Sequence, residues 1–259
     1  WGRVKEKQGC HARAFDFKLY DNSHQKSGRY SPAKDDILII LRPISTNSHM
    51  AYVPYGPNLL PESVDRGIFL EELSESLRPY LPETCLLIRY DLSWESPWSK
   101  DVDGQRGAQM PDPRVQEMRM NFGTHFHNLF KAPTDILPAH TVFLDLEKAN
   151  DQLLKKMKPK TRYNIRLALR KGVKVHDVGH HNLETWYSLY AETAARNGIN
   201  NQGIRYFRSV LGTQAPGSRS PAKVSLLLAE YEGKALAGMV LAMSGGRATY
   251  LYGASSSKN

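Results

Sequence analysis

The densest group of residues with chemical potential is a basic segment from Lys155 to Lys174. It holds nine Lys and Arg residues and no acidic residue in 20 positions. Arg162, Arg166 and Arg170 recur at every fourth position, so a helix would align three guanidinium groups on one face. The same helix would turn its apolar side chains toward a core: Ile165, Ala168 and Leu169. Such a face suits a polyanion, although a run of charge is also commonly a solvated surface.

Other kinds of catalytic chemistry have little support in the residues. The sequence contains no GxSxG, GxxxxGK[ST] or GxGxxG pattern, which disfavours serine nucleophiles, ATP hydrolysis and dinucleotide binding. Cys10 and Cys85 lie far apart, with no CxxC pair and no His/Cys spacing that would hold zinc. The histidines have no evident catalytic partner: His125, His127, His180 and His181. We therefore expect no metal, no cofactor and no covalent enzyme intermediate.

Composition and charge indicate a globular protein with an anionic partner. The chain has 259 residues, 41% of them hydrophobic, which is enough to bury a sizeable core in one or two domains. Its 35 basic and 26 acidic residues give a net charge of +9. The longest apolar run, Ile37 to Leu41, is far shorter than a membrane-spanning helix. The short apolar runs predict no transmembrane segment, so any membrane contact would be peripheral, and the two widely spaced cysteines favour a reducing cytoplasm.

The elements that must position the basic segment follow from hydrophobic periodicity. Phe69, Leu70, Leu73 and Leu77 repeat at helical spacing, which predicts a helix over residues 67–80. Further helices are predicted at residues 114–128, 183–196 and 203–211. Strands are predicted at residues 12–20, 36–43, 49–53, 85–91, 141–146, 223–231, 234–243 and 247–252, with a turn at Glu232-Gly233. Residues 92–113 and 212–222 are predicted to be irregular. This order of elements favours an α/β protein of the acyltransferase type.

Five segments resemble the FemX/FemA/FemB family of aminoacyltransferases that build peptidoglycan cross-bridges. The longest runs from Thr141 to Val175 and contains TVFLDLEK and KPKTRYNIRLALRKGVKV. The others are WGRVKEKQG at the start, YVPYGP at 52–57, ETAARNGIN followed by YF at 192–207, and YLYGASS at 250–256. Each is short, but their order and spacing together span nearly the whole chain.

The resemblance implies a fold of two tandem acyl-CoA N-acyltransferase-like (GNAT-like) domains, at residues 1–140 and 141–259. The second domain would be incomplete at its C-terminal end, because a lysine that the family uses in catalysis would lie beyond Asn259. The start at Trp1 also looks truncated relative to the family. No heptad arm interrupts residues 141–259, so the chain is most similar to the compact FemX-like form.

The resemblance also implies a function. Family members are tRNA-dependent aminoacyltransferases that add an amino acid from aminoacyl-tRNA to the stem peptide of a peptidoglycan precursor. The acceptor would be UDP-MurNAc-pentapeptide or lipid II, and contact with the inner membrane face would be peripheral. The ester donor is already activated, so the protein would chiefly position the two substrates. The basic segment would bind tRNA through four side chains: Lys160, Arg162, Arg166 and Arg170.

The motifs place candidate acceptor-binding residues. Lys5, with Arg3 beside it, matches a lysine that contacts the precursor in the family. Tyr206 matches a precursor-binding tyrosine, and Gln202 stands four residues earlier, where the family has an arginine. Tyr252 matches a further tyrosine, and Tyr250 would share its strand face. Arg89 and Asp91 match a recurrent strand-end pair, interpreted as a structural ion pair or a substrate contact.

Two alternative functions stay open. The same fold would permit an acetyl-CoA-type N-acyltransferase. However, such enzymes usually hold pyrophosphate at a glycine-containing turn before a helix, and the Gly238 region is typical of a plain strand. The other alternative is a catalytically inactive nucleic-acid-binding module.

Overall fold

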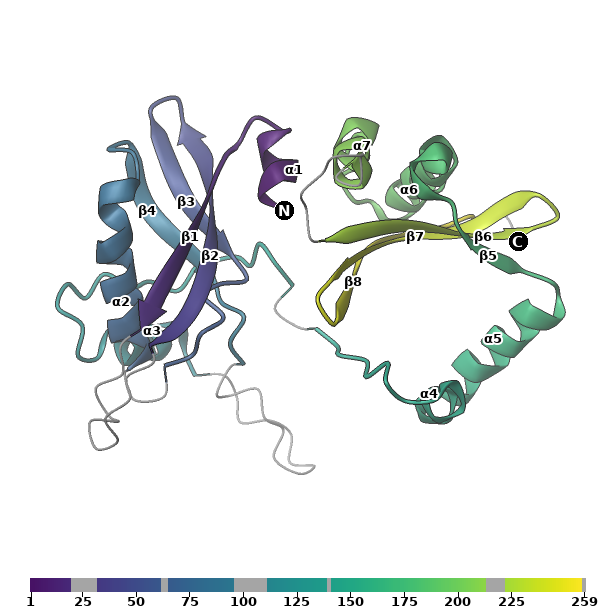
Figure 1. Cartoon of the computed structure of the whole chain (residues 1–259), viewed down its shortest axis with the longest axis horizontal. Helices are drawn as coiled ribbons and strands as arrows, with labels where there is room; N and C mark the ends of the chain where they lie inside the picture. Colours follow the sequence, from purple (N-terminus) through teal and green to yellow (C-terminus); the bar gives the residue numbers. More distant parts are fainter. Residues whose placement is uncertain (20–31, 62–64, 96–110, 139–140, 213–221, 258–259) are drawn as a thin grey trace. The chain divides into compact units, whose positions relative to one another are not determined.

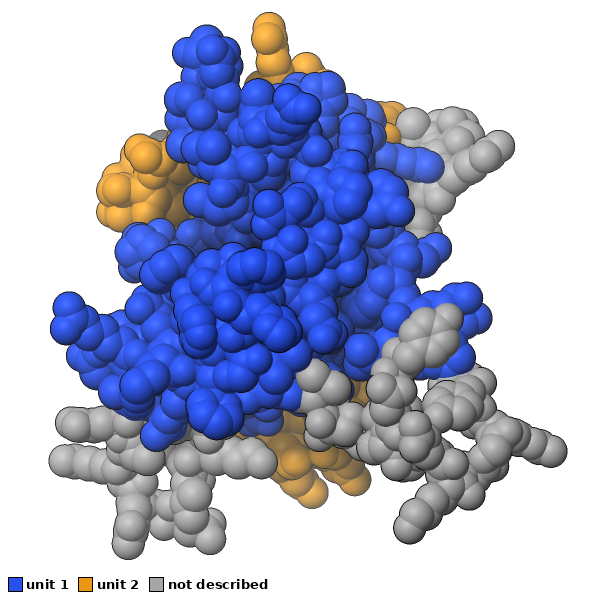
Figure 2. Space-filling view, turned by 90° about the vertical axis from the view of Figure 1, so that its left-hand side faces the viewer, with its two compact units in different colours: residues 1–141 blue, residues 142–259 orange. Residues whose placement is uncertain are grey.

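A computed structural model describes residues 1–19, 32–61, 65–95, 111–138, 141–212 and 222–257. The chain divides into two compact units, Trp1–Thr141 and Val142–Asn259, which Figure 2 colours separately. Each unit is built on its own four-stranded sheet (Figure 1).

The sheet of the first unit has the strand order β1-β2-β3-β4. Its strands are β1 (His11–Leu19), β2 (Ala33–Ser45), β3 (Ser48–Pro54) and β4 (Cys85–Asp91). The first three are antiparallel, whereas β4 is parallel to β3. A parallel pair needs a crossover, and here α2 (Arg66–Leu77) with the short helix η2 (Arg78–Tyr80) supplies it. Asp65 begins α2 by accepting a hydrogen bond from the backbone N–H of Gly67 at 2.9 Å.

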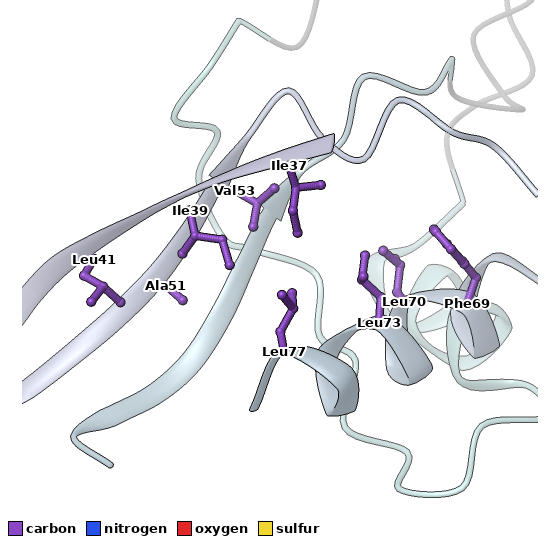
Figure 3. Packing of buried hydrophobic residues seen from close by; sticks show 9 residues of the cluster. All are labelled: Ile37, Ile39, Leu41, Ala51, Val53, Phe69, Leu70, Leu73 and Leu77. Carbon is purple, nitrogen blue, oxygen red and sulfur yellow. The ribbon is translucent and has the colours of Figure 1, made fainter. Parts of the chain in front are cut away.

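The core of the first unit lies between α2 and one face of this sheet (Figure 3). Alternate residues of β2 and β3 point toward α2, as a pleated strand requires. Helix α2 contributes side chains at helical spacing to the same core. The cluster comprises Ile37, Ile39, Leu41, Ala51, Val53, Phe69, Leu70, Leu73 and Leu77. The sequence periodicity that predicted this helix is therefore confirmed.

The opposite face of the same sheet carries α1 (Gly2–Glu6), a helix that the sequence analysis did not predict. Gly2 lies against Leu38, and a Cβ built on the glycine would be 3.0 Å from the leucine Cδ1. Val4 is buried, as is Ile40 of this face. This short helix therefore holds Lys5 against the face that bears the even-numbered residues of β2.

The helix predicted at residues 114–128 is shorter in the structure, where α3 spans Pro113–Asn121. Asp112 caps its start through the backbone N–H of Arg114 at 2.9 Å. It ends before Gly123, whose positive φ of 79° is incompatible with a continuing right-handed helix. Residues 122–138 contain no regular helix or strand.

The sheet of the second unit has the order β5-β6-β7-β8 and is antiparallel throughout. Its strands are β5 (Lys174–Asp177), β6 (Lys223–Tyr231), β7 (Lys234–Ser244) and β8 (Arg247–Ser255). The helices are α4 (Asn150–Lys156), α5 (Pro159–Arg170), η3 (Gly179–Asn182), α6 (Leu183–Asn197) and α7 (Ile204–Leu211). The turn predicted at Glu232-Gly233 is confirmed, and both of its residues have positive φ angles, 48° and 74°.

Helices α6 and α7 cover one face of the second sheet (Figure 1). Trp186 of α6 is fully buried and lies over Gly238 of β7, where a Cβ would be 2.3 Å from its Cδ1 atom. Around this contact pack further buried side chains of the same face: Leu226, Leu228, Val240 and Phe207. Gly238 is thus a packing glycine inside a regular strand, and that strand was predicted.

The sequence prediction was wrong for residues 141–146, which form no strand. Their apolar alternation is typical of a strand, but none of the described strands pairs with them. Val142 is 92% exposed, although Arg247 lies 5.3 Å from the ring of Phe143. The helix α4 and the strand β5 were not predicted. Most of the predicted irregular segments, residues 96–110 and 213–221, lie outside the described residues.

Candidate functional site

Two candidate residues of the second unit, Tyr206 and Tyr252, form a direct pair. Tyr206 is on α7 and Tyr252 on β8, and their hydroxyl oxygens are 2.6 Å apart. Their rings meet edge to face at 5.9 Å, and Tyr252 also contacts Phe207 and Tyr190 in the same geometry. Burial raises the pKa of both phenols, and the shared hydrogen bond raises the pKa of Tyr206 further. Both hydroxyls therefore stay protonated at neutral pH.

A β-bulge separates Tyr250 from this pair, which corrects the prediction that Tyr250 and Tyr252 share a strand face. Val240 of β7 pairs with Tyr252 and Leu241 pairs with Tyr250, so Leu251 is the extra residue. The Tyr250 hydroxyl lies where a Cβ of Gly253 would be, on the face opposite to Tyr252. Tyr250 is 63% exposed. The bulge turns only Tyr252 toward α6 and α7.

The residue that departs from the family pattern, Gln202, lies one position before the N-cap residue of α7. It is exposed, and it precedes Tyr206 by four residues. Arg205 is also exposed on α7, but consecutive helical residues diverge in direction, so it points away from Tyr206.

Lys5 in the first unit lies near another cation, Arg42 of β2, on the sheet face that α1 covers. Its ammonium group donates a hydrogen bond to Gln8 Oε1 at 3.1 Å and lies 4.8 Å from the centre of the Trp1 ring. Burial lowers the pKa of Lys5, and the charge of Arg42 on β2 lowers it further, against an opposing effect of Cys10. Arg3 is exposed and lies two residues from Lys5, on another side of α1. The charges of Arg42 and Lys5 therefore interact, which the sequence did not indicate.

On this same sheet face, Arg89 and Asp91 form a structural network with Tyr52. Tyr52 donates to Asp91 Oδ2 at 2.9 Å, and Arg89 Nε donates to Asp91 Oδ1 at 3.2 Å. The backbone N–H of Leu137 donates to the same carboxylate at 3.1 Å, and Arg89 also donates to the carbonyl of Thr134. Burial and the carboxylate raise the pKa of Tyr52. This geometry supports a structural ion pair that ties residues 134–137 to the end of β4.

Helix α5 carries the predicted tRNA-binding residues on an open face. Pro159, Arg162, Tyr163, Arg166, Leu169 and Arg170 line a shallow groove of about 650 Å³. Leu169 is 69% exposed, so its predicted position in a core is wrong, whereas Ile165 and Ala168 are half-buried. Lys160 is exposed on the same helix. The groove combines cations with apolar surface because Tyr163 and Leu169 share the face of the arginines.

The three arginines of this face are not equivalent. Arg162 Nη1 donates to the carbonyls of Met157 at 2.7 Å and Lys155 at 3.1 Å, where α4 ends. The guanidinium thus satisfies carbonyls that the helix leaves unpaired. Within the described part of the chain, the guanidinium groups of Arg166 and Arg170 make no hydrogen bond or ion pair of this kind. The spacing of the arginines could not reveal this difference.

Sequence reasoning missed two features of these surfaces. Arg42 follows Leu38 and Ile40 at alternate positions of β2, so the strand period could have placed it near Lys5. Tyr163 lies one residue after Arg162, and its 57% exposure became evident only from the packing. Among the described residues, no group of His, Cys, Asp and Glu is arranged to hold a metal ion. No described helix has the length and apolar character needed to cross a bilayer.

The two units, each a four-stranded sheet with helices packed against it, define an α/β protein. The FemAB family model matches residues 1–219, and the chain belongs to this family. The crystal structure of FemX superposes with a TM-score of 0.64 at 16% identity, over 100% of this chain and 74% of that one. This likeness confirms the predicted GNAT-like α/β fold.

Curated relatives are lipid II:glycine glycyltransferases. The protein from Staphylococcus epidermidis is 29% identical over 154 residues, which cover 57% of this chain and 35% of that protein. The one from Staphylococcus aureus is 31% identical over 75 residues, or 29% of this chain and 18% of that protein. The chain thus spans about a third or less of the length of these relatives.

Proposed function

We propose that this chain is part of an aminoacyltransferase that moves an amino acid from aminoacyl-tRNA to the stem peptide of a peptidoglycan precursor. Membership of the FemAB family supports the reaction class, and the relatives' names support lipid II as the acceptor class. A UDP-linked precursor carries the same muramyl-pentapeptide and diphosphate, so it is the second acceptor to test.

The observation that carries this proposal is the hydroxyl pair of Tyr206 and Tyr252. A phenolic hydroxyl can both donate and accept hydrogen bonds, so the pair presents groups of the kind that bind a polar ligand. Both groups are half-buried and neutral, so they can bind sugar hydroxyls or phosphate oxygens without repelling an anion. In this proposal the pair orients the precursor, and Gln202 contributes a neutral amide where an arginine would add charge.

Lys5 and Arg42 would supply the positive charge for the acceptor's diphosphate. Their charges interact across one sheet face of the first unit, and each cation would be stabilised by an anion between them. Lys provides a compact charge and Arg a planar donor pair, which together suit two phosphoryl groups. Arg3 would add longer-range attraction from the exposed side of α1.

Helix α5 would bind the tRNA. Arg166, Arg170 and Lys160 are available to phosphate oxygens, whereas Arg162 holds α4 in place. The exposed ring of Tyr163 offers a surface on which an unpaired base can stack. Both substrates would then be positioned for direct attack of the amine on the ester, with no covalent enzyme intermediate.

The test is transfer of a labelled amino acid from charged tRNA to purified acceptor by the full-length protein. Lipid II in vesicles and soluble UDP-MurNAc-pentapeptide are compared, with uncharged tRNA plus free amino acid as the control. Transfer that depends on charged tRNA supports the proposal. Acylation from acetyl-CoA in place of charged tRNA would overturn it in favour of the N-acyltransferase alternative, and tRNA binding without any transfer would favour an inactive binding module.

A further inference from the structure

A third tyrosine, Tyr190 of α6, lies beside the pair of Tyr206 and Tyr252. Its ring meets the ring of Tyr252 at an angle of 89°, with the centroids 6.2 Å apart, and it packs edge to face on Phe207 at 4.8 Å. Burial raises the pKa of Tyr206 and Tyr252, and the Tyr190 phenol adds to this rise in both cases. Three phenols, from α6, α7 and β8, therefore converge in the second unit.

The ring of Tyr190 is held in place by the packing of α6 on the sheet. It stacks on the fully buried Trp186 with the ring centroids 5.2 Å apart and the planes 16° from parallel. Trp186 in turn lies directly over Gly238 of β7. The Tyr190 side chain is only 7% exposed, so close packing fixes the direction in which its hydroxyl points.

The Tyr190 hydroxyl differs from the other two because it makes no hydrogen bond within the described part of the chain, whereas Tyr206 and Tyr252 bond each other. Tyrosines as buried as this one usually have such a partner. Among the described residues, the fully enclosed side-chain atoms without a partner are the indole nitrogens of Trp94 and Trp186. The Tyr190 hydroxyl is not one of these enclosed atoms, so it is accessible beside the tyrosine pair.

We propose that Tyr190 is a third contact of the acceptor site and donates a hydrogen bond to an uncharged oxygen of the precursor, in its sugar or peptide part. A phenol can supply this donor. A phosphate oxygen beside the aromatic cluster would lose hydration, which is costly without a cation, whereas a hydroxyl or amide oxygen needs only one donor. The inference rests on the proposed function, because it assumes that Tyr206 and Tyr252 bind the precursor.

The experiment is calorimetric titration of the full-length protein with UDP-MurNAc-pentapeptide, and with UDP as a probe that lacks the sugar and the peptide. The test variant, Tyr190→Phe, removes the hydroxyl and keeps the ring. Tyr187→Phe is the matched control, because it removes a hydroxyl of the same helix that accepts from Asn201 Nδ2 at 3.3 Å. We expect Tyr190→Phe to weaken precursor binding by about two- to tenfold and to leave UDP binding unchanged. The control should bind both ligands like the wild type.

Kinetics and stability separate this contact from a packing role of Tyr190. A contact made equally in the ground state and the transition state changes the KM for the precursor, while kcat and the KM for charged tRNA stay the same. The melting temperature of Tyr190→Phe should equal or exceed that of the wild type, because no hydrogen bond within the protein is lost. A lower melting temperature with an unchanged precursor KM would assign the residue to the fold alone.

The other tyrosines distinguish failure of this inference from failure of the proposed function. Precursor binding that weakens in Tyr206→Phe and Tyr252→Phe but not in Tyr190→Phe would overturn the inference alone. An equal loss of UDP and precursor binding in Tyr190→Phe would place its hydroxyl at the diphosphate and overturn the assignment to the sugar or peptide. Unchanged precursor binding in all three variants would count against the proposed acceptor site itself.

Discussion

The hydroxyl oxygens of Tyr206 and Tyr252 lie 2.6 Å apart although 46 residues separate them in the chain. Helix α7 and strand β8 bring them together over the buried ring of Phe207, which contacts both. This contact joins the helical layer of the second unit to the sheet strand that follows the β7–β8 turn. It therefore links the stability of the fold to the surface proposed for the acceptor.

The first prediction concerns the energy of this contact. Tyr206→Phe and Tyr252→Phe should each lower the free energy of unfolding by about 0.5–1.5 kcal/mol, the usual net effect of one hydrogen bond. The double variant should cost less than the sum, because the second change removes a group that the first left without its partner. Chemical denaturation of the three variants measures the coupling. Strict additivity would show that the hydroxyls do not interact in solution.

The second prediction concerns packing at Gly238. Gly238→Ala would bring a methyl group to 2.3 Å from Trp186 and should destabilise the protein by about 1–3 kcal/mol. Gly246→Ala is the matched control, since a Cβ there meets nothing within 4 Å and the residue's φ lies outside the left-handed region. Thermal unfolding compares the two variants. Equal melting temperatures would contradict the close contact of Trp186 with β7.

The third prediction separates the roles of the arginines on α5. Arg166→Gln with Arg170→Gln should weaken tRNA binding and reduce the slope of log affinity against log salt by about one for each phosphate group that is no longer bound. The protein's stability should not change. Arg162→Gln should instead lower stability by about 1–3 kcal/mol, since two carbonyls at the end of α4 would be left without their charged donor. Filter binding across salt concentrations and thermal unfolding measure both effects, and unchanged tRNA affinity in the double variant would leave α5 as solvated surface.

The fourth prediction concerns the acceptor's diphosphate. Lys5→Ala and Arg42→Ala should each raise the KM for the precursor by roughly tenfold or more, the equivalent of a charged hydrogen bond worth about 1.5–3 kcal/mol. Affinity for tRNA should be unaffected. Gln202→Arg should lower the same KM if the exposed position before α7 faces the precursor. Steady-state kinetics at varied precursor concentration measures this effect. A rise in the KM for tRNA, with the KM for the precursor unchanged, would reassign these residues to tRNA binding.

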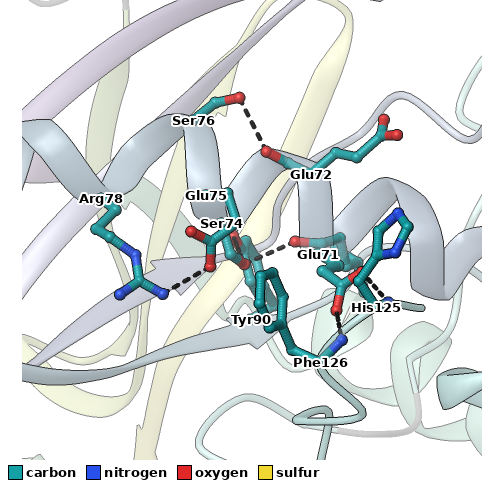
Figure 4. A network of polar contacts seen from close by, with 10 residues as sticks. Glu71, Glu72, Ser74, Glu75, Ser76, Arg78, Tyr90, His125 and Phe126 are labelled. Carbon is teal, nitrogen blue, oxygen red and sulfur yellow. Dashed lines mark hydrogen bonds and ion pairs between the residues drawn. The ribbon is translucent and has the colours of Figure 1, made fainter.

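The fifth prediction concerns the pH dependence of the backbone that Glu71 fixes at His125 and Phe126 (Figure 4). Burial alone would raise the pKa of Glu71, but the N–H donors of His125 and Phe126 outweigh it and lower the pKa below its ordinary value of 4.5. A lowered pKa in the folded state stabilises the protein above pH 4.5, and this stabilisation is lost as the pH falls through the folded-state pKa. Hydrogen exchange at the amides of residues 125 and 126 should accelerate in that acidic range. Glu71→Gln should exchange faster already at neutral pH and show a flatter pH response.

The sequence by itself determined the local elements and the family resemblance. The period of Phe69, Leu70, Leu73 and Leu77 specifies a helix with one apolar face. That face must be covered by another layer, which in the structure is the sheet. The strands β6 and β7 and the turn between them follow from similarly local signals. Local patterns succeed here because neighbours in the chain are also neighbours in these elements.

Residues 141–146 show where local pattern fails. Their alternation satisfies the period of a strand, but a strand also needs a partner for its backbone groups, and partners are not encoded locally. The end of α3 is similar, because the contacts of Asn121 with Leu129 and of Glu71 with His125 compete with further helix. Each case turns on hydrogen bonds to backbone or side chains several residues away.

Only the tertiary structure decided which candidate residues meet and which way they face. The sequence placed Tyr250 and Tyr252 on one strand face, but the bulge at Leu251, a property of the β7–β8 register, turned them apart. The sequence also gave Arg162 the same tRNA-binding role as Arg166, whereas the Arg162 guanidinium donates to a carbonyl at the end of α4. The physical reason is common to both cases. A residue's type and spacing fix what it can bind, but sheet register and helix packing fix what is within its reach.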